Sequence, residues 1–199
     1  MNNEMTENSI AEQELPLEGA HLTTNGEEKK QKYRRTLIST LVMLVLSVAA
    51  AFLLATQLMP VLQIYGSSMN PTLWDRDTVV AVKDKTPARG DVVAFNLNNK
   101  ILVKRVIGVG GDRIDVLEDG TVLVNGEQLE ETYITAKVDG DPDITLPYQV
   151  PEDSYFVMGD HREKSVDSRH TVVGCVTKEQ LIGKLVLRIW PWDEIGFLK

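Results

Sequence analysis

The chain contains one long apolar segment, Leu37–Met59, and this segment limits the folds that are open to it. Its 23 residues carry no charge. At about 1.5 Å per residue in an α-helix they extend about 34 Å, enough to cross a hydrocarbon layer of about 30 Å. Pro60 follows directly, and proline is poorly tolerated in a helix interior because it lacks the backbone N–H. We therefore expect one transmembrane helix over residues 36–59.

A cleaved secretory signal is the alternative interpretation of this segment, because such a signal also joins a basic start to an apolar run. The run here is longer than the roughly 7–15 apolar residues typical of a signal. Ala49 and Ala51 fit the small-x-small pattern of a cleavage site, but they lie inside the run. We therefore expect the segment to be retained as an anchor.

The charges before the anchor predict its orientation. Residues 1–28 contain seven acidic side chains and no Lys or Arg, whereas Lys29–Arg35 contains five Lys and Arg. This composition predicts that residues 1–35, an acidic tail and a basic collar, are disordered. Basic residues before a span favour the cytoplasmic side. We therefore expect the tail in the cytoplasm and residues 60–199 on the extracytoplasmic face of the cell membrane.

Beyond the anchor the pattern changes to short runs rich in Val and Ile, which predict a mostly β domain. The expected strands are Thr78–Val82, Asp91–Phe95, Ile101–Val109, Arg113–Leu117, Thr121–Val124, Tyr155–Met158 and Lys184–Ile189. Asp119-Gly120 and Asn125-Gly126 are typical of hairpin turns, and they predict a small inserted hairpin and loop over about 114–151. Only Lys178–Ile182 suggests a short helix.

Composition excludes several classes of function. The net charge is −8, with 21 Lys and Arg against 29 Asp and Glu, so no basic excess is available to bind nucleic acid. The single cysteine, Cys175, excludes an intramolecular disulfide and CxxC motifs. His161 and His170 do not form an HExxH motif, so we expect no metal and no organic cofactor.

A loop of small and turn-forming residues, GSSMNPTL over 66–73, places hydroxyl groups soon after the anchor. A serine there requires a base before it can act as a nucleophile. One possible base is a histidine, His161 or His170, oriented by Asp160 or Asp167. The other is a lysine on the strand that follows, so the sequence leaves two kinds of hydrolase open.

Strand alternation places Lys104 on one apolar face and Arg105 on the other. At least one of these cations is therefore partly desolvated. Burial disfavours the charged form of lysine and lowers its pKa from about 10.4, which allows it to act as a general base. A lysine whose ammonium extends to water along a strand edge is the alternative.

Four motifs carry a resemblance to a known family. GSSMNPTL (66–73), RGDVVAF (89–95), KRVIGVGGD (104–112) and GDHREKSVDSR (159–169) resemble, in order and spacing, the conserved boxes of type I signal peptidases. These are membrane serine proteases that remove signal peptides from secreted preproteins. The single anchor and the short inserted region resemble the Gram-positive bacterial branch, so the resemblance implies a signal-peptidase-like β catalytic domain.

The resemblance also implies roles for individual residues. Ser68 matches the nucleophile and Lys104 the general base, while Ser165 matches a serine that hydrogen-bonds the lysine. Asp167 and Arg169 match a supporting ion pair, and Asp160 and Arg162 match the opening positions of the last box. A groove for small residues at the positions one and three before the cut is expected to be lined by Ile64, Met69, Leu73, Leu102 and Val103.

Two departures from the family pattern matter. Gly66 occupies the position at which some relatives have a serine that helps to form the oxyanion hole, which leaves the backbone N–H of Ser68 and another donor. His161, Glu163 and Lys164 replace Asn, Asp and Asn in a common form of the last box.

The resemblance also implies partners, which are signal peptides and the lipid bilayer. It further implies a position close to the secretion translocon and a monomeric protein. A non-catalytic β module that binds secreted chains stays open as an alternative.

Overall fold

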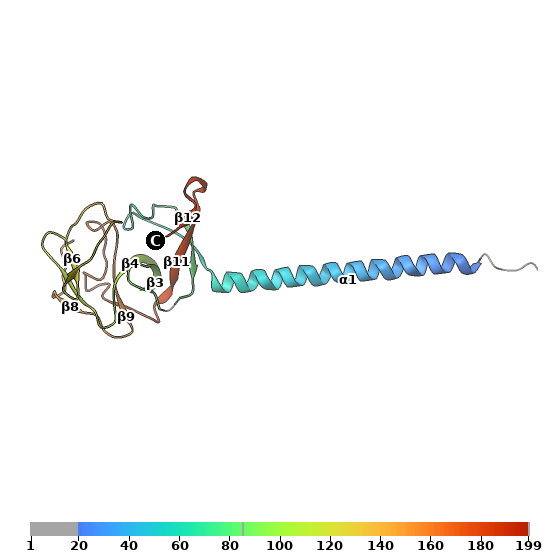
Figure 1. Ribbon diagram of the computed structural model, residues 1–199, viewed down its shortest axis with the longest axis horizontal. Helices are drawn as coiled ribbons and strands as arrows, with labels where there is room; N and C mark the ends of the chain where they lie inside the picture. The colour runs from blue at the N-terminus through green and yellow to red at the C-terminus, as the bar shows by residue number, and fades with distance from the viewer. Residues whose placement is uncertain (1–19, 85, 199) are drawn as a thin grey trace, which may run out of the picture. The chain divides into compact units, whose positions relative to one another are not determined.

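The computed structural model describes residues 20–84 and 86–198, with side chains from residue 29 onward except residue 55. One long helix, α1 (Ala20–Leu58), precedes a region of strands that also holds a short 3-10 turn, η1 (Trp192–Glu194) (Figure 1). The chain is therefore mostly β with one N-terminal helix, which confirms the predicted fold class.

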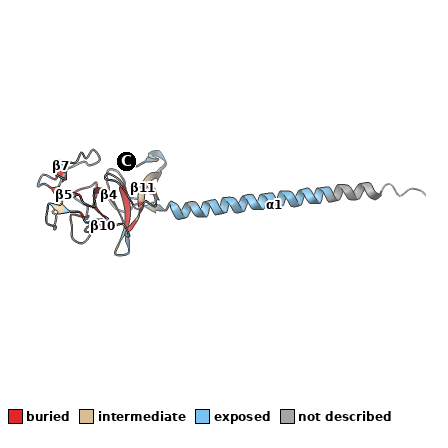
Figure 2. Ribbon diagram, turned by 60° about the horizontal axis from the view of Figure 1, so that its bottom comes forward, coloured by how far each residue is buried: buried red, intermediate tan, exposed pale blue. Residues whose placement is uncertain are grey.

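Helix α1 has the properties of a membrane anchor. Its segment Lys29–Leu58 is long and apolar enough to cross a membrane, and its most apolar stretch of 18 residues has a mean hydropathy of 2.7. None of that stretch is buried inside the protein, and Figure 2 shows the described part of the helix as exposed. The helix ends at Leu58, two residues before Pro60, as expected. A lipid layer is the environment in which such an exposed apolar surface is stable.

The start of α1 differs from the expectation. We expected residues 1–35 to be disordered, but the helix begins at Ala20 and includes the basic collar Lys29–Arg35. Lysine, arginine, glutamine and glutamate are good helix formers, and extending an existing helix is much cheaper than nucleating one. The apolar segment therefore supplies the nucleus from which the helix continues into the collar. Residues 1–19 lie outside the described residues, so the predicted disorder there stays a prediction.

The larger sheet is antiparallel and contains eight strands, which in spatial order are β1 (Val61–Gln63), β2 (Thr78–Val82), β11 (Leu181–Trp190), β3 (Val92–Leu97), β4 (Lys100–Val109), β9 (Ser154–Met158) and β10 (Val176–Thr177), with β12 (Gly196–Phe197) paired to β11. Strand β4 pairs with β3 on one side and β9 on the other. Lys104 lies opposite Val93 and Arg105 opposite Val92. This interior place in the sheet explains why both cations are buried.

A second, four-stranded antiparallel sheet is formed by β7 (Glu127–Gln128), β6 (Val122–Val124), β5 (Arg113–Val116) and β8 (Tyr148–Gln149). It occupies the region in which we expected an inserted hairpin and loop. Figure 1 shows β6 and β8 at the opposite end of the domain from β11 and β12. The segment 129–147 between β7 and β8 has no regular structure, and it contributes side chains to the site described below.

The domain buries its apolar side chains in three clusters. One cluster packs Ile64, Met69 and Leu73, from the loop after β1, against β2, β3 and β11. A second joins β5 and β6 to β4 and β9, and a third lies around Phe95 and Val106. The first cluster anchors the loop that carries Ser68, because two of its large apolar side chains insert into the core.

All seven predicted strands are present, and β2 has the predicted bounds. The predicted short helix over Lys178–Ile182 is wrong: β11 begins at Leu181 and pairs with β3 and β2, so tertiary pairing overrides the local pattern. The strands that were not predicted have two or three residues, too few to show an alternation. These are β1, β7, β8, β10 and β12.

Candidate active site

Ser68 lies in a loop that is fixed at both ends. Met69 and Leu73 are 2% and 0% exposed, and the Leu73 N–H donates to the Met69 carbonyl at 2.9 Å. Before the serine, Gly66 has a φ of +91°, a conformation that favours glycine, and its N–H donates to Asp75 Oδ1 at 2.8 Å. These contacts leave the half-buried Ser68 side chain between two anchored ends.

Lys104 meets this serine directly. Its Nζ lies 2.7 Å from Ser68 Oγ, and the lysine is only 4% exposed. Burial lowers the pKa of Lys104 from 10.5 to about 8; Asp167 and Asp160 raise it, and Arg169 lowers it. About one molecule in ten therefore has a neutral Lys104 at pH 7. The alternative of a lysine extended to water does not describe this side chain.

The two side chains lie in an open groove of about 580 Å³. Its walls come from β1 with the residues that follow it and from the first half of β4. Four of the five residues predicted to line a substrate groove lie along this groove: Ile64, Met69, Leu102 and Val103. Leu73 does not, because it is fully buried in the core cluster beneath the loop, where it anchors the chain. The sequence alone cannot distinguish an apolar residue that lines the groove from one that packs only in the core.

Two buried ion pairs lie close to the site. Arg105 donates to both oxygens of Asp160, at 2.9 and 2.7 Å, and Arg169 donates to both oxygens of Asp167, at 2.8 and 2.9 Å. All four side chains are nearly inaccessible to solvent. Burial alone would raise the pKa of Asp167, but Arg169 holds that pKa below its usual value. The predicted pair Asp167–Arg169 is thus formed.

Arg162 is the third buried arginine, and its carboxylate partner was not predicted. Arg162 Nη1 donates to Glu131 at 3.0 Å, Nη2 donates to the other oxygen, and the Tyr133 hydroxyl also donates to Glu131 at 2.9 Å. Glu131 and Tyr133 lie in the segment between β7 and β8. A charge balance could have indicated them, because three buried arginines need more than the two aspartates of the last box.

The Ser165 hydroxyl does not bond Lys104 in this arrangement. Among the described residues its Oγ has no hydrogen-bond partner, although it is close enough to Asp167 to lower the pKa of that carboxyl. It does lie beside the nucleophile loop. A Cβ added to Gly159 would come within 2.2 Å of Ser165 Oγ and 2.5 Å of the Ser68 carbonyl oxygen, so the last box approaches this loop where only glycine fits.

The histidines have other partners. His161 Nδ1 lies 3.3 Å from the Ser67 carbonyl oxygen, and His170 Nδ1 accepts from the Asp167 N–H at 3.4 Å. Within the described part of the chain, Lys104 Nζ is the side-chain partner of Ser68 Oγ. The geometry therefore favours the lysine over the histidines as the base. In residues 20–84 and 86–198 no group of three or more His, Cys, Asp or Glu side chains is placed to hold a metal.

The fold and the site thus combine an apolar helix long enough to cross a membrane with a half-buried serine that contacts a buried lysine. A family profile described as "Signal peptidase, peptidase S26" matches residues 34–190. The chain belongs to this signal peptidase family. Family membership confirms the resemblance seen in the four sequence motifs.

Individual relatives agree with this assignment. The chain is 34% identical over 186 residues to "Signal peptidase I" of Bacillus amyloliquefaciens, a match that covers 85% of this chain and 97% of that one. It is 37% identical over 146 residues to "Probable signal peptidase I-2" of Synechocystis, covering 67% of this chain and 64% of that relative. A crystal structure of a signal peptidase I from Enterococcus faecalis V583 matches with a TM-score of 0.42 and 31% identity, over 50% of this chain and 97% of that one. The two relatives matched by sequence support signal peptidase I function.

Proposed function

We propose that this protein is a serine endopeptidase that cleaves N-terminal signal peptides from secreted preproteins after small-x-small sites, with Ser68 as nucleophile and Lys104 as general base. The observation that carries the proposal is the 2.7 Å contact between Lys104 Nζ and Ser68 Oγ on a lysine with a pKa of about 8. Such a lysine is neutral often enough at physiological pH to accept a proton.

The reaction follows from this geometry. Neutral Lys104 takes the proton of Ser68 as Oγ attacks the carbonyl carbon of the scissile peptide. The lysine then gives this proton to the leaving amine, which releases the mature protein and leaves an acyl ester on Ser68. Lys104 next removes a proton from water, whose oxygen attacks the ester, and returns the proton to Ser68. No metal or organic cofactor takes part in these steps.

The oxyanion of the tetrahedral intermediate requires hydrogen-bond donors. In the described part of the chain the backbone N–H of Ser68 has no hydrogen-bond partner, which suits this role. The Gly66 N–H is already bonded to Asp75 and is a poorer donor. We therefore assign the Ser68 N–H as one oxyanion donor.

The groove binds the residues before the cut. Ile64, Met69, Leu102 and Val103 give it an apolar surface next to Ser68, which suits the small apolar residues of a signal-peptide end. Asp160 and Asp167, each with its arginine partner, and Ser165 support the dyad from the motif over residues 159–169. Ser165 would act by turning its free hydroxyl toward Lys104 during the reaction.

The membrane places enzyme and substrate together. The basic collar Lys29–Arg35 before the apolar segment favours a cytoplasmic N-terminus, with the catalytic domain on the extracytoplasmic face of the cell membrane. Ser68 follows the end of α1 by ten residues, so the site is tied to the bilayer surface. Signal peptides and the bilayer are then its partners, close to the secretion translocon, and one copy of the chain provides the complete dyad, consistent with a monomer.

The test is cleavage of a preprotein with an Ala-x-Ala site by the full chain in detergent or liposomes. Ser68→Ala and Lys104→Ala should each abolish cleavage, whereas Lys83→Ala, which changes an exposed lysine outside the groove, should retain it. His161→Ala and His170→Ala should also retain it. Loss of activity in a histidine variant with survival of Lys104→Ala would instead support a Ser–His hydrolase. An inactive wild type, under conditions that support a known signal peptidase, would support a binding module.

A further inference from the structure

Three arginines are buried in one polar network, and one of them takes its carboxylate partner from the segment 129–147. Arg105, Arg162 and Arg169 are 1%, 2% and 0% exposed. A buried cation is costly unless hydrogen bonds and an opposite charge compensate it. Two of the carboxylates, Asp160 and Asp167, belong to the same motif as two of the arginines. The third, Glu131, comes from the segment 129–147 between β7 and β8.

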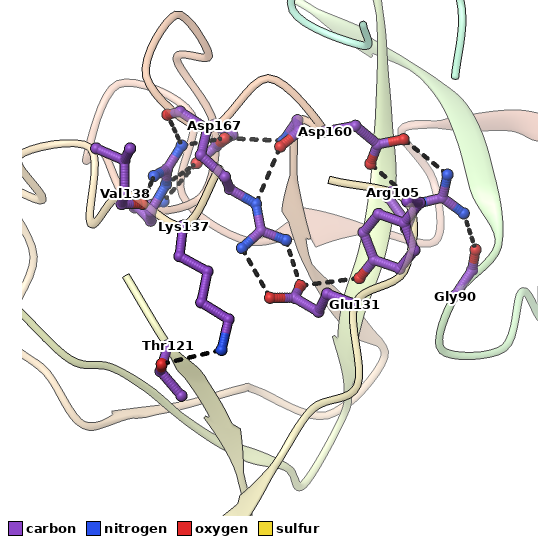
Figure 3. A network of polar contacts seen from close by, with 12 residues as sticks. Gly90, Arg105, Thr121, Glu131, Lys137, Val138, Asp160 and Asp167 are labelled. Atoms are coloured by element: carbon purple, nitrogen blue, oxygen red, sulfur yellow. Dashed lines mark hydrogen bonds and ion pairs between the residues drawn. The ribbon is translucent and has the colours of Figure 1, made fainter. Parts of the chain in front are cut away.

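Glu131 and Tyr133 together hold two of these arginines. The Glu131 side chain is 1% exposed and accepts from both terminal nitrogens of Arg162 and from the Tyr133 hydroxyl. The Tyr133 ring lies under the Arg105 guanidinium, 4.0 Å from its carbon to the ring centroid. Figure 3 shows Glu131 within this network, beside Arg105 and Asp160. One short stretch of chain therefore contacts both arginines at once.

Arg105 connects this stretch to the reacting groups. It follows Lys104 on β4, and it pairs with Asp160, which also accepts from the Thr72 hydroxyl in the nucleophile loop. The next residue after Asp160, His161, donates its backbone N–H to the Ser68 carbonyl at 3.0 Å. The position of Arg105 thus sets where β4 and the Ser68 loop meet.

The same segment also holds Arg169. Arg169 Nη1 donates to the carbonyl of Asp139 at 2.7 Å, and a Cβ on Gly140 would lie 2.1 Å from that nitrogen. Gly140 has a φ of +76°, so the close approach and the backbone conformation both require glycine. The segment 129–147 therefore contacts every buried arginine of the network.

We propose that Glu131, with Tyr133, is a positioning residue for the peptidase reaction: by holding Arg162 and Arg105 it fixes the distance between Lys104 and Ser68. This inference rests on the proposed function. It assigns to the segment 129–147, which joins two strands of the second sheet, a role in the reaction as well as in folding, through side chains that do not line the groove. The lining of that groove comes from residues 61–69 and 100–104.

The test compares Glu131→Gln, Glu131→Asp and Tyr133→Phe with Glu130→Gln, an exposed glutamate next to the site. Each full-length variant is assayed on the Ala-x-Ala preprotein at a temperature well below its measured unfolding midpoint. We expect Glu131→Gln to lower kcat at least tenfold with KM within twofold of wild type. Glu131→Asp should recover part of that loss, because it keeps the charge. Tyr133→Phe should lower kcat severalfold, and Glu130→Gln should not change it.

Other outcomes decide against the proposal. A wild-type kcat in Glu131→Gln would overturn it, as would equal losses in Glu131→Gln and Glu131→Asp that match their unfolded fractions. Ser68→Ala and Lys104→Ala in the same assay separate the two proposals. If both are inactive while Glu131→Gln is normal, only the positioning role fails. If the wild type is inactive, or either dyad variant is active, the proposed function and this inference fail together.

Discussion

Two neighbouring residues of β4 are buried cations, yet their surroundings differ. Arg105 has a bidentate carboxylate, a backbone carbonyl at 2.7 Å and an aromatic ring as partners. Lys104 has the neutral hydroxyl of Ser68 as its close partner. Ser165 Oγ, from the last motif, and Asn70 Oδ1, from the loop that carries Ser68, are buried without a hydrogen-bond partner among the described residues. The arginine side of the strand is satisfied, and the lysine side is not.

This difference separates a scaffold from a reactive site. A cation with full compensation stays charged and rigid, whereas an undercompensated lysine releases its proton more easily. The fold thus lowers the pKa of one cation while it stabilises the charge of its neighbour. Each of the following substitutions changes one side of the comparison.

The largest change in the free energy of unfolding is expected on the Arg105 side of β4. Asp160→Asn keeps the size of the side chain but leaves the Arg105 charge without its carboxylate, so the free energy of unfolding should fall by about 3–5 kcal/mol. The matched control is Asp153→Asn, which breaks the exposed pair with Lys178 and should cost less than about 1 kcal/mol. Thermal and chemical unfolding of the full chain in detergent measures both. Equal costs would mean that solvent already compensates Arg105.

On the lysine side of β4, removal of the Lys104 charge should stabilise the fold. The pKa of Lys104 is lowered from 10.5 to about 8, so at pH 7 its charge costs about 3 kcal/mol of stability. Lys104→Met removes that cost and loses one hydrogen bond worth about 0.5–1.5 kcal/mol. We expect a net gain of about 1–3 kcal/mol at pH 7 in an inactive protein.

The pH dependence of this gain has a definite sign. Between about pH 8 and 10.5 the unfolded chain binds more protons at Lys104 than the folded chain, so wild-type stability rises with pH in this window. The advantage of Lys104→Met should therefore be complete below pH 8 and disappear toward pH 10.5. Lys100→Met, on the exposed end of the same strand, should show no such trend. If Lys104→Met were less stable than wild type at pH 7, the claim that the Lys104 charge is undercompensated would be wrong.

Activity should report the same pKa. If neutral Lys104 is the base, kcat/KM rises about tenfold per pH unit below about pH 8 and levels off above it, a change of about 1.4 kcal/mol per unit. The measurement is a pH profile of preprotein cleavage between pH 6 and 9.5, with unfolding followed over the same range. A profile with its midpoint near 6.5 that is lost in a histidine variant would assign the base to His161 or His170.

The sequence predicts the unsatisfied side better than the satisfied side. Ser68 and Lys104 lie 36 positions apart, but each belongs to a local pattern, a small-residue loop and an apolar strand. Strand β2 was predicted with its observed bounds for the same reason. Periodicity carries the bounds of β2, whereas the roles of Ser68 and Lys104 come from the resemblance of their motifs to those of signal peptidases.

The remaining features depend on long-range contacts. Glu131 and Tyr133 lie in a segment without periodicity, and only the fold shows that they meet Arg162 and Arg105. Leu73 and Met69 are both apolar and pack in the same core cluster, and the fold alone shows that Met69 also lines the groove. Leu181 and Ile182 were expected in a helix because the pairing partner of β11 is more than 80 residues away in the sequence.

The smallest change tests the unpartnered hydroxyl. Ser165→Ala removes a buried oxygen that makes no hydrogen bond among the described residues, so the free energy of unfolding should change by less than about 1 kcal/mol. If this hydroxyl turns toward Lys104 during the reaction, kcat should fall about threefold to tenfold, the value of one hydrogen bond of about 0.5–1.5 kcal/mol. Ser168→Ala is the control with the opposite expectation, because Ser168 Oγ accepts from the Val157 N–H at 2.9 Å and donates to the Gly174 carbonyl at 2.7 Å.

These two serines lie three residues apart in one motif and differ in what they bond. Ser168→Ala should cost more stability than Ser165→Ala, since it leaves a buried N–H and a carbonyl without partners. The fall in kcat, relative to the loss in free energy of unfolding, should instead be larger for Ser165→Ala than for Ser168→Ala. If Ser165→Ala leaves kcat unchanged, the hydroxyl plays no part in the reaction, and Lys104 is oriented by Ser68 and by the charges of Asp160, Asp167 and Arg169 alone.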